Sequence, residues 1–261
     1  MNSRLLEGIK KIYSGKDIVY KQISLFSIIG ILSILGAYLY LGKASFFTIK
    51  SFTIWIVAIM EFVWTFYFIG YETKLINNIF HSPDNIVPEM NREPVKIMYN
   101  KFPLVLFIIN SLIILASITT HKENLIFLLT IVISMIMTLF QIGFAKQYSD
   151  SDILDIFKVL KIKDYIAIFI KRILINLAAF ITSYGVVFVA VLIAGLIVLL
   201  TGFVHSHSFS EIVASAQSSQ LALTKLSIYS TTILLNYFMT IGNLAWDYDV
   251  VKLFEERSKK S

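Results

Sequence analysis

One carboxylate, Glu61, lies in the middle of a long apolar segment of this chain of 261 residues. Two amides, Asn110 and Asn236, lie near the centres of two other apolar segments. A charged side chain inside a hydrocarbon layer costs about 2.5–3.5 kcal/mol on insertion scales, so such groups are usually neutral, paired or functional. If the segments are membrane helices, we expect these three side chains to meet at one depth. They would form either a structural hydrogen-bonded cluster or a site that responds to protons or cations.

A second set of polar residues consists of His205-x-His207 followed by Glu211. These are metal-ligand types, but no other His or Cys lies nearby to complete a tetrahedral site. The chain has no Cys at all, which excludes disulfides, thiolate metal sites and Cys nucleophiles. We therefore predict no metal and no cofactor.

Known catalytic patterns are also missing from the sequence. It contains no Gly-x-Ser-x-Gly, no His-Glu-x-x-His and no phosphate-binding glycine loop. We predict that the protein is not an enzyme. If ATP drives it, a separate ATPase subunit must supply the energy.

Composition indicates a membrane protein. Hydrophobic residues make up 57% of the chain and charged residues 15%, whereas soluble domains have about 45–50% and about 25%. Lipid must therefore cover much of the surface. The sequence predicts one integral membrane domain over residues 1–261, an all-α bundle with six apolar segments that suit transmembrane helices. These segments are 23–41, 52–71, 102–118, 125–145, 173–204 and 226–246.

Lys and Arg are distributed unevenly between the connecting segments. The N-terminal segment, the second and fourth loops and the C-terminal tail hold 19 of the 23, and the other three loops hold four. Because basic residues concentrate in cytoplasmic loops, we predict six spans in a cell membrane with both termini cytoplasmic. The first span should remain uncleaved, since its apolar part is longer than that of a signal peptide. This orientation accounts for the net charge of +6 without a nucleic-acid partner.

Three segments have unusual lengths or patterns. The fifth apolar segment, 173–204, is too long for a simple crossing and too short for two, which predicts one tilted or protruding helix. Residues 4–14 and 152–163 carry apolar and basic residues at helical spacing, typical of amphipathic helices in the headgroup layer. Alternatively, each is an ordinary cytoplasmic extension packed on the bundle.

Two further patterns concern the cytoplasmic side. The second, fourth and sixth spans all reach it through an Ile-Gly pair, at Gly70, Gly143 and Gly242. This pattern is either a degenerate repeat of helical hairpins, as in many transporters, or a coincidence of a common dipeptide. All four prolines lie within residues 83–103, which predicts a defined, non-helical second loop.

The end of the second span carries a short motif. Gly70-Tyr71 is followed by Asn77 and then by Val87-Pro88-Glu89. This resembles the Gly-Tyr…Leu-Pro-Glu signature of the prokaryotic integral-membrane family catalogued as domain of unknown function 4013, with Val87 in place of the usual Leu. The resemblance implies a bacterial or archaeal origin and a similar architecture, and it transfers no catalytic residues.

Two classes of function remain after these exclusions. The first is a permease-like or transport-associated subunit for a small or amphiphilic molecule, which the six spans, the mid-span polar residues and the possible repeat favour. The second is a membrane-embedded interaction, immunity or scaffold protein with no transport path. The predicted partners are the lipid bilayer and, for the first class, a further protein subunit.

Overall fold

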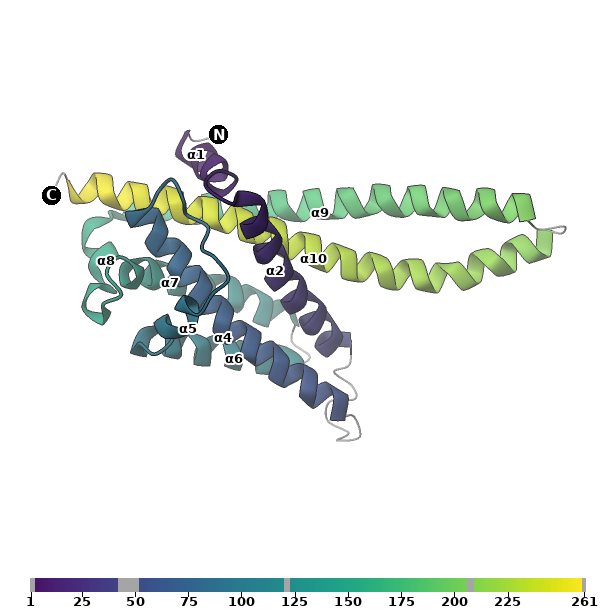
Figure 1. The fold of residues 1–261 in the computed structure, drawn as a ribbon, viewed down its shortest axis with the longest axis horizontal. Helices are drawn as coiled ribbons and strands as arrows, with labels where there is room; N and C mark the ends of the chain where they lie inside the picture. Colours follow the sequence, from purple (N-terminus) through teal and green to yellow (C-terminus); the bar gives the residue numbers. More distant parts are fainter. Residues whose placement is uncertain (1–2, 42–51, 120–122, 206–208, 260–261) are drawn as a thin grey trace.

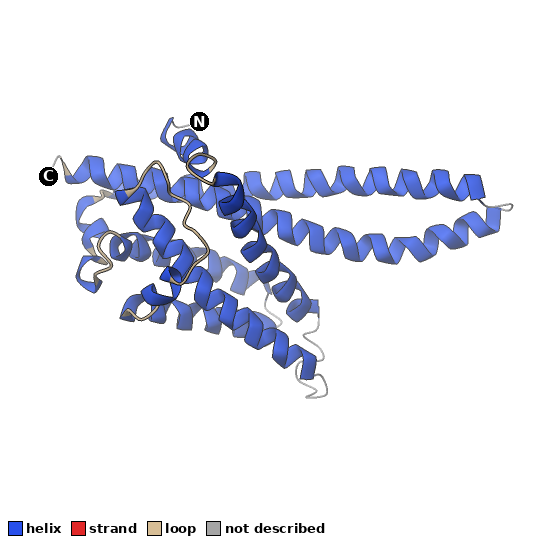
Figure 2. Cartoon of the chain, viewed as in Figure 1, coloured by secondary structure: helices blue, strands red, loops and turns tan. Residues whose placement is uncertain are grey.

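The computed structural model describes residues 3–41, 52–119, 123–205 and 209–259, and this part of the chain contains helices and no strand (Figure 2). The all-α prediction is therefore confirmed. The elements are α1 (Ser3–Ile12), α2 (Ile18–Leu41), α4 (Phe52–His81), α5 (Glu93–Ile97), α6 (Lys101–Thr119), α7 (Glu123–Ala145), the 3-10 turn η1 (Asp150–Asp152), α8 (Asp155–Val159), α9 (Ile162–His205) and α10 (Phe209–Ser258).

Helices α9 and α10 form an antiparallel hairpin that extends well beyond the other helices (Figure 1). At a rise of 1.5 Å per residue, α9 is about 66 Å long and α10 about 75 Å long. The predicted fifth span, 173–204, lies within one continuous helix, which excludes two short crossings there. The segment between the fifth and sixth predicted spans is largely helical, because α10 begins at Phe209.

Three helical stretches in the described residues are long and apolar enough to cross a membrane, fewer than the six expected. They are Ile18–Leu39, Trp55–His81 and Ile162–Ile197. Two shorter apolar stretches, Lys101–Ile113 and Met135–Ala145, belong to α6 and α7. The remaining predicted span, 226–246, lies within α10, where Ser, Thr, Tyr and Asn residues interrupt the apolar run.

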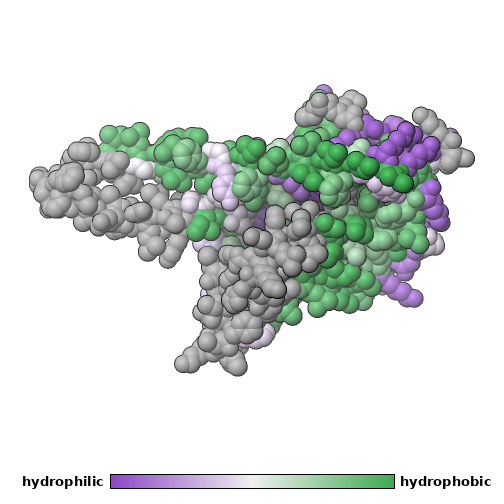
Figure 3. Space-filling model, turned by 180° about the vertical axis from the view of Figure 1, so that it is seen from behind, coloured by the Kyte–Doolittle hydropathy of each residue, from purple (hydrophilic) through white to green (hydrophobic). Residues whose placement is uncertain are grey.

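The surface divides into a hydrophilic end and an apolar remainder. Hydrophilic residues gather at the end that holds α1 and the C-terminal part of α10, and apolar residues cover most of the rest of the surface that is coloured by hydropathy (Figure 3). Large apolar side chains are exposed along α9, among them Leu177, Ile181, Phe188, Leu192 and Leu196. Monomeric soluble proteins rarely expose contiguous patches of this kind, so lipid or protein must cover this helix.

The two termini are joined at the hydrophilic end. Arg4 of α1 forms an ion pair with Glu256 of α10 at 3.0 Å. Gly8 packs so closely on α10 that a Cβ there would lie 3.1 Å from the carbonyl oxygen of Ala245. Ile12 at the end of α1 is fully buried in the main hydrophobic core. The apolar face of α1 therefore packs against protein, as the second reading of residues 4–14 proposed.

The single amphipathic helix predicted over residues 152–163 is wrong in extent. The segment is divided instead: Asp155–Val159 forms α8, Leu160 is extended, with ψ of 140°, and α9 begins at Ile162. Ile156 is fully buried, and the ring of Phe157 lies 4.9 Å from that of Phe140 on α7. The apolar stripe of this segment thus also packs against the bundle.

The three Ile-Gly pairs mark close contacts at the hydrophilic end. A Cβ on Gly70 of α4 would lie 2.1 Å from the carbonyl oxygen of Pro94 at the start of α5. A Cβ on Gly143 of α7 would lie 2.6 Å from the carbonyl oxygen of Ile153, just after η1. Gly242 of α10 receives the side chain of Ile175 on α9. The first two glycines therefore serve the same purpose: each lets the backbone that follows its helix cross directly over it.

The proline-containing loop is held to α4 by tyrosines. Tyr71 donates a hydrogen bond to the carbonyl oxygen of Pro88 at 3.0 Å, and Tyr67 donates one to that of Asn91 at 3.1 Å. The prediction that this loop is non-helical is wrong, because it contains the short helix α5, which begins at Glu93 with Pro94 in its first turn. The two halves of the Gly-Tyr…Val-Pro-Glu motif are therefore in direct contact.

Candidate functional site

The three mid-span polar residues do not form one hydrogen-bonded cluster. Asn236 donates to the hydroxyl of Ser33 on α2 at 2.9 Å, and Asn110 donates to the carbonyl oxygen of Leu106 one turn back in α6. Glu61 is 8% exposed and faces α2, where a Cβ on Gly36 would lie 3.8 Å from its Oε1. Glu61 and Asn236 thus contact α2 within one turn of each other, whereas Asn110 bonds within its own helix.

The side chains of His205, His207 and Glu211 lie outside the described residues. Among the residues that the structure describes, no group of three or more His, Cys, Asp or Glu side chains is arranged to hold a metal ion.

A different set of charged residues is buried where α4, α9 and α10 meet at the hydrophilic end. Glu72 of α4, Arg172 of α9 and Asp247 of α10 interact electrostatically there, and we call them the buried charge cluster. Arg172 is 6% exposed and Asp247 is 0% exposed, whereas Glu72 is half-buried. Each comes from a different helix, so tertiary packing alone brings them together.

The helices place these groups through specific contacts. Trp246 is fully buried and donates its indole N–H to the carbonyl oxygen of Ile168 at 2.9 Å, which fixes α10 against α9. The guanidinium of Arg172 lies over the Trp246 ring, 4.6 Å from its centroid, and such a contact stabilises a desolvated cation. Glu72 is positioned next to α7. Gln141 of α7 donates a hydrogen bond to the hydroxyl of Thr73 at 2.9 Å, and its amide nitrogen lies 3.5 Å from a carboxylate oxygen of Glu72.

Several polar atoms around the cluster are buried without a hydrogen-bonding partner among the described residues. These atoms are Arg172 Nη1, Asn176 Oδ1, Asn243 Oδ1 and both carboxylate oxygens of Asp247. Asn176 and Asn243 each lie one helical turn from a charged member of the cluster, on the same helix face. An unsatisfied buried polar group costs about 1–3 kcal/mol. Five such atoms in one place therefore indicate a functional site, or bound water or ions.

Neighbouring buried carboxylates show that this chain is able to pair such groups. Asp249, two residues after Asp247 and 1% exposed, forms ion pairs with Lys171 and, at 3.1 Å, with Arg4. Asp164 on α9 pairs with Arg257 at 2.8 Å. Asp247 has no ion pair within 4 Å in the described part of the chain. Glu61 also has one buried carboxylate oxygen without a hydrogen-bonding partner, but among the carboxylates that the structure describes Asp247 alone has both of its oxygens in this state.

The charges of the cluster do not cancel. Two ionised carboxylates and one guanidinium leave one excess negative charge in a site withdrawn from water. Burying an uncompensated charge is strongly unfavourable, and a group in this position is neutralised or paired. A proton on one carboxylate, or a monovalent cation, would supply the missing positive charge.

Sequence reasoning missed this cluster because each member falls just outside an apolar run. Glu72 follows the predicted second span by one residue, Arg172 precedes the fifth by one, and Asp247 follows the sixth by one. Arg172 was therefore counted with the cytoplasmic cations. The available signal was the shared position of the three charges, directly at the cytoplasmic ends of three predicted helices.

The residues of the family resemblance have packing roles in the structure. Gly70 admits α5, Tyr71 bonds to Pro88, and Asn77 donates to the carbonyl oxygen of Ala145 on α7 at 2.7 Å. Family models, curated proteins and solved structures were each searched, and none of them matches this chain.

Proposed function

We propose that this protein is a permease-like, transport-associated membrane subunit that holds a proton or a monovalent cation at its buried charge cluster. The observation that carries this proposal is Asp247, a fully buried carboxylate whose two oxygens lack hydrogen-bonding partners among the described residues, whereas Asp249, two residues later, forms two ion pairs. Ionisable groups inside membrane bundles commonly mark ion or proton pathways. A small or amphiphilic molecule is the proposed cargo.

The proposal includes six membrane crossings by α2, α4, α6, α7, α9 and α10, with the hydrophilic end in the cytoplasm. Support comes from the excess of basic residues in the segments assigned to that side and from the ion pair that joins the two terminal helices. The buried charge cluster then lies at the cytoplasmic ends of the spans, so protons and cations would reach it from the cytoplasm over a short distance.

Thermal unfolding of the purified protein in detergent micelles tests the ion site without knowledge of the cargo. In choline chloride, the stability of the natural protein should fall as the pH rises from 6 to 9, by up to about 1.4 kcal/mol per pH unit for one proton held only in the folded state. If a cation takes the place of the proton, Na⁺ or K⁺ should restore the stability lost at high pH. Asp247→Asn leaves Glu72 and Arg172 as a neutral pair, so it should abolish both dependences and be the more stable form at pH 9.

Asp150→Asn is the matched control, since Asp150 is an exposed aspartate in η1. It should retain the pH and cation dependence of the natural protein. If the natural protein and Asp247→Asn have the same pH and cation dependence, the ion site is excluded.

The second candidate function, an interaction or scaffold protein without a transport path, is favoured by the hairpin of α9 and α10. This hairpin extends past the other helices and exposes large apolar side chains along α9 (Figure 1). A stability profile indifferent to pH and cations, together with stable capture of another membrane protein through the hairpin, would favour this candidate.

A further inference from the structure

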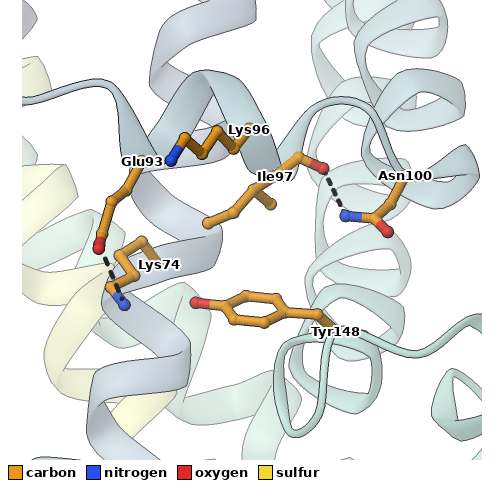
Figure 4. Close-up of a pocket in the computed structure, with 6 residues that line it drawn as sticks. All are labelled: Lys74, Glu93, Lys96, Ile97, Asn100 and Tyr148. Atoms are coloured by element: carbon orange, nitrogen blue, oxygen red, sulfur yellow. Dashed lines mark hydrogen bonds and ion pairs between the residues drawn. The ribbon is translucent and has the colours of Figure 1, made fainter.

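Two cavities open beside the proline-containing loop, and neither is lined by a residue of the buried charge cluster. The first has a volume of about 290 Å³ and is lined by Lys74, Glu93, Lys96, Ile97, Asn100 and Tyr148 (Figure 4). The second, of about 250 Å³, is lined mainly by polar groups, including Lys21, Asn78, Ser82, Asn85 and Glu89. Lys74 and Glu93 line both cavities, and their ion pair of 3.2 Å forms the boundary that the cavities share.

Lys21 in the second cavity is a buried cation without a counter-ion. It is 2% exposed, and its ammonium group donates to the side-chain oxygen of Asn85 at 2.6 Å. No carboxylate lies within ion-pair distance of it in the described part of the chain. An ammonium group has three donors and no acceptor, so one amide oxygen leaves it under-satisfied. The cavity beside it is where an anion would complete its bonding.

Tyr148 in the first cavity is held in a strained conformation. Its φ is +54°, which is uncommon for a bulky residue that is not glycine, and its buried hydroxyl has no hydrogen-bonding partner among the described residues. Burial and then the nearby Glu93 raise the pKa of Tyr148, so the hydroxyl remains a donor at neutral pH. In Figure 4 this hydroxyl points toward the side of the cavity where Lys74 lies. Backbone strain of this kind concentrates at ligand-binding sites.

We propose that the two cavities form one binding site for a phosphate ester, with Lys74 at its centre, Lys21 on one side, and Lys96 and the Tyr148 hydroxyl on the other. In the ligand-free state the Glu93 carboxylate forms an ion pair with the Lys74 ammonium group. A bound phosphate pairs with this ammonium group and displaces the Glu93 carboxylate. Glu93 is exposed, so its carboxylate can turn toward water. Lys21 lies in the first turn of α2, so the ligand is either a phospholipid headgroup or a soluble phosphate ester.

Titration calorimetry with glycerol 3-phosphate, on the purified protein in micelles, tests the soluble source. Native mass spectrometry with added phosphatidylglycerol or phosphatidylcholine tests the lipid source. Charge-assisted hydrogen bonds contribute about 1.5–3 kcal/mol, so Lys74→Gln should weaken the binding of the active ligand by about tenfold or more. Tyr148→Phe, which removes one neutral donor, should weaken it by about threefold to tenfold.

Glu93→Gln separates this proposal from a purely structural ion pair. Because it removes the group that competes for Lys74, it should tighten the binding of the phosphate ester by about threefold or more. Lys10→Gln is the control: Lys10 is an exposed lysine of α1 and lines neither cavity, so its removal should leave the dissociation constant unchanged. Lys21→Gln is the second test at the other end of the site and should weaken binding as Lys74→Gln does.

The proposal is supported if either ligand binds and the dissociation constants of the variants change as stated. The ligand that binds then shows whether the phosphate belongs to a lipid or to a soluble ester. Absence of binding by both ligands would overturn it. So would equal dissociation constants for Lys74→Gln and Lys10→Gln, or weaker binding by Glu93→Gln. None of these outcomes depends on whether the buried charge cluster holds an ion.

Discussion

Arg172→Met should destabilise the folded protein by about 3 kcal/mol, the lower end of the cost of removing one partner of a buried ion pair, because it takes away the positive charge that acts on both Glu72 and Asp247. Methionine keeps most of the side-chain volume against Trp246, so the loss should arise from charge. Equilibrium unfolding in mixed micelles, followed by circular dichroism, measures the effect. The same substitution combined with Asp247→Asn should recover part of the lost stability, because only one carboxylate is then left to be protonated.

Lys163→Met provides the comparison on the same helix. Lys163 is exposed, and a surface substitution of this kind is expected to change stability by no more than about 0.5 kcal/mol. If Arg172 only packs on Trp246, Arg172→Met will have a small effect, and Asp247→Asn will not rescue it. That pattern would remove the electrostatic basis of the buried charge cluster.

Gly70→Ala and Gly143→Ala should be the next most damaging substitutions. The added methyl group would lie 2.1 Å from a backbone oxygen of Pro94 in the first case and 2.6 Å from one of Ile153 in the second. Backbone atoms cannot move aside as a flexible side chain does, so the following segment must lift off its helix. Overpacking typically costs about 1–3 kcal/mol, and more where backbone is displaced. Thermal unfolding of the variants measures the loss.

Gly185→Ala on α9 is the matched control. A Cβ there meets no heavy atom within 4 Å, so the substitution should be neutral or slightly stabilising through its helix propensity. Gly242→Ala should fall between these cases, because its close contact is with the flexible side chain of Ile175. If all four variants had the same stability, the close crossing of α5 and of the segment after η1 would be refuted.

Much of the helical content was predictable because lipid exposure demands long apolar runs. A helix such as α9, whose apolar residues point in all directions, has a sequence signature that requires no knowledge of its neighbours. The helical conformation of residues 209–225 was not predicted, because this stretch lacks a long apolar run. Its Ser, Gln, Ala and Leu residues do not form a continuous apolar segment, so hydropathy predicts a loop there. In the structure the helical backbone of α10 continues through these residues.

The candidate site could not be predicted from residue patterns because it depends on packing. Hydropathy ends each span at the first charge, which placed Glu72, Arg172 and Asp247 outside the bundle. In the structure α10 contacts α1, α2, α4, α8 and α9, and these contacts bury its residues 244–251 on every side. Glu61, which stands out in the sequence, is also buried, and one of its carboxylate oxygens has no hydrogen-bonding partner among the described residues. Neither described cavity is lined by Glu61.

The orientation of the bundle underlies both proposed sites, and labelling of single cysteines tests it most directly. The chain contains no Cys, so each variant carries one unique label. Ser14→Cys, Gln147→Cys and Ser258→Cys lie at exposed positions of the hydrophilic end, and Ser208→Cys lies between α9 and α10. Six crossings with a cytoplasmic hydrophilic end predict that a membrane-impermeant maleimide labels the first three only in inverted vesicles and Ser208→Cys only in intact cells. Labelling of Ser14→Cys and Ser258→Cys from opposite faces would contradict the six-span arrangement, and labelling of both from outside would reverse its orientation.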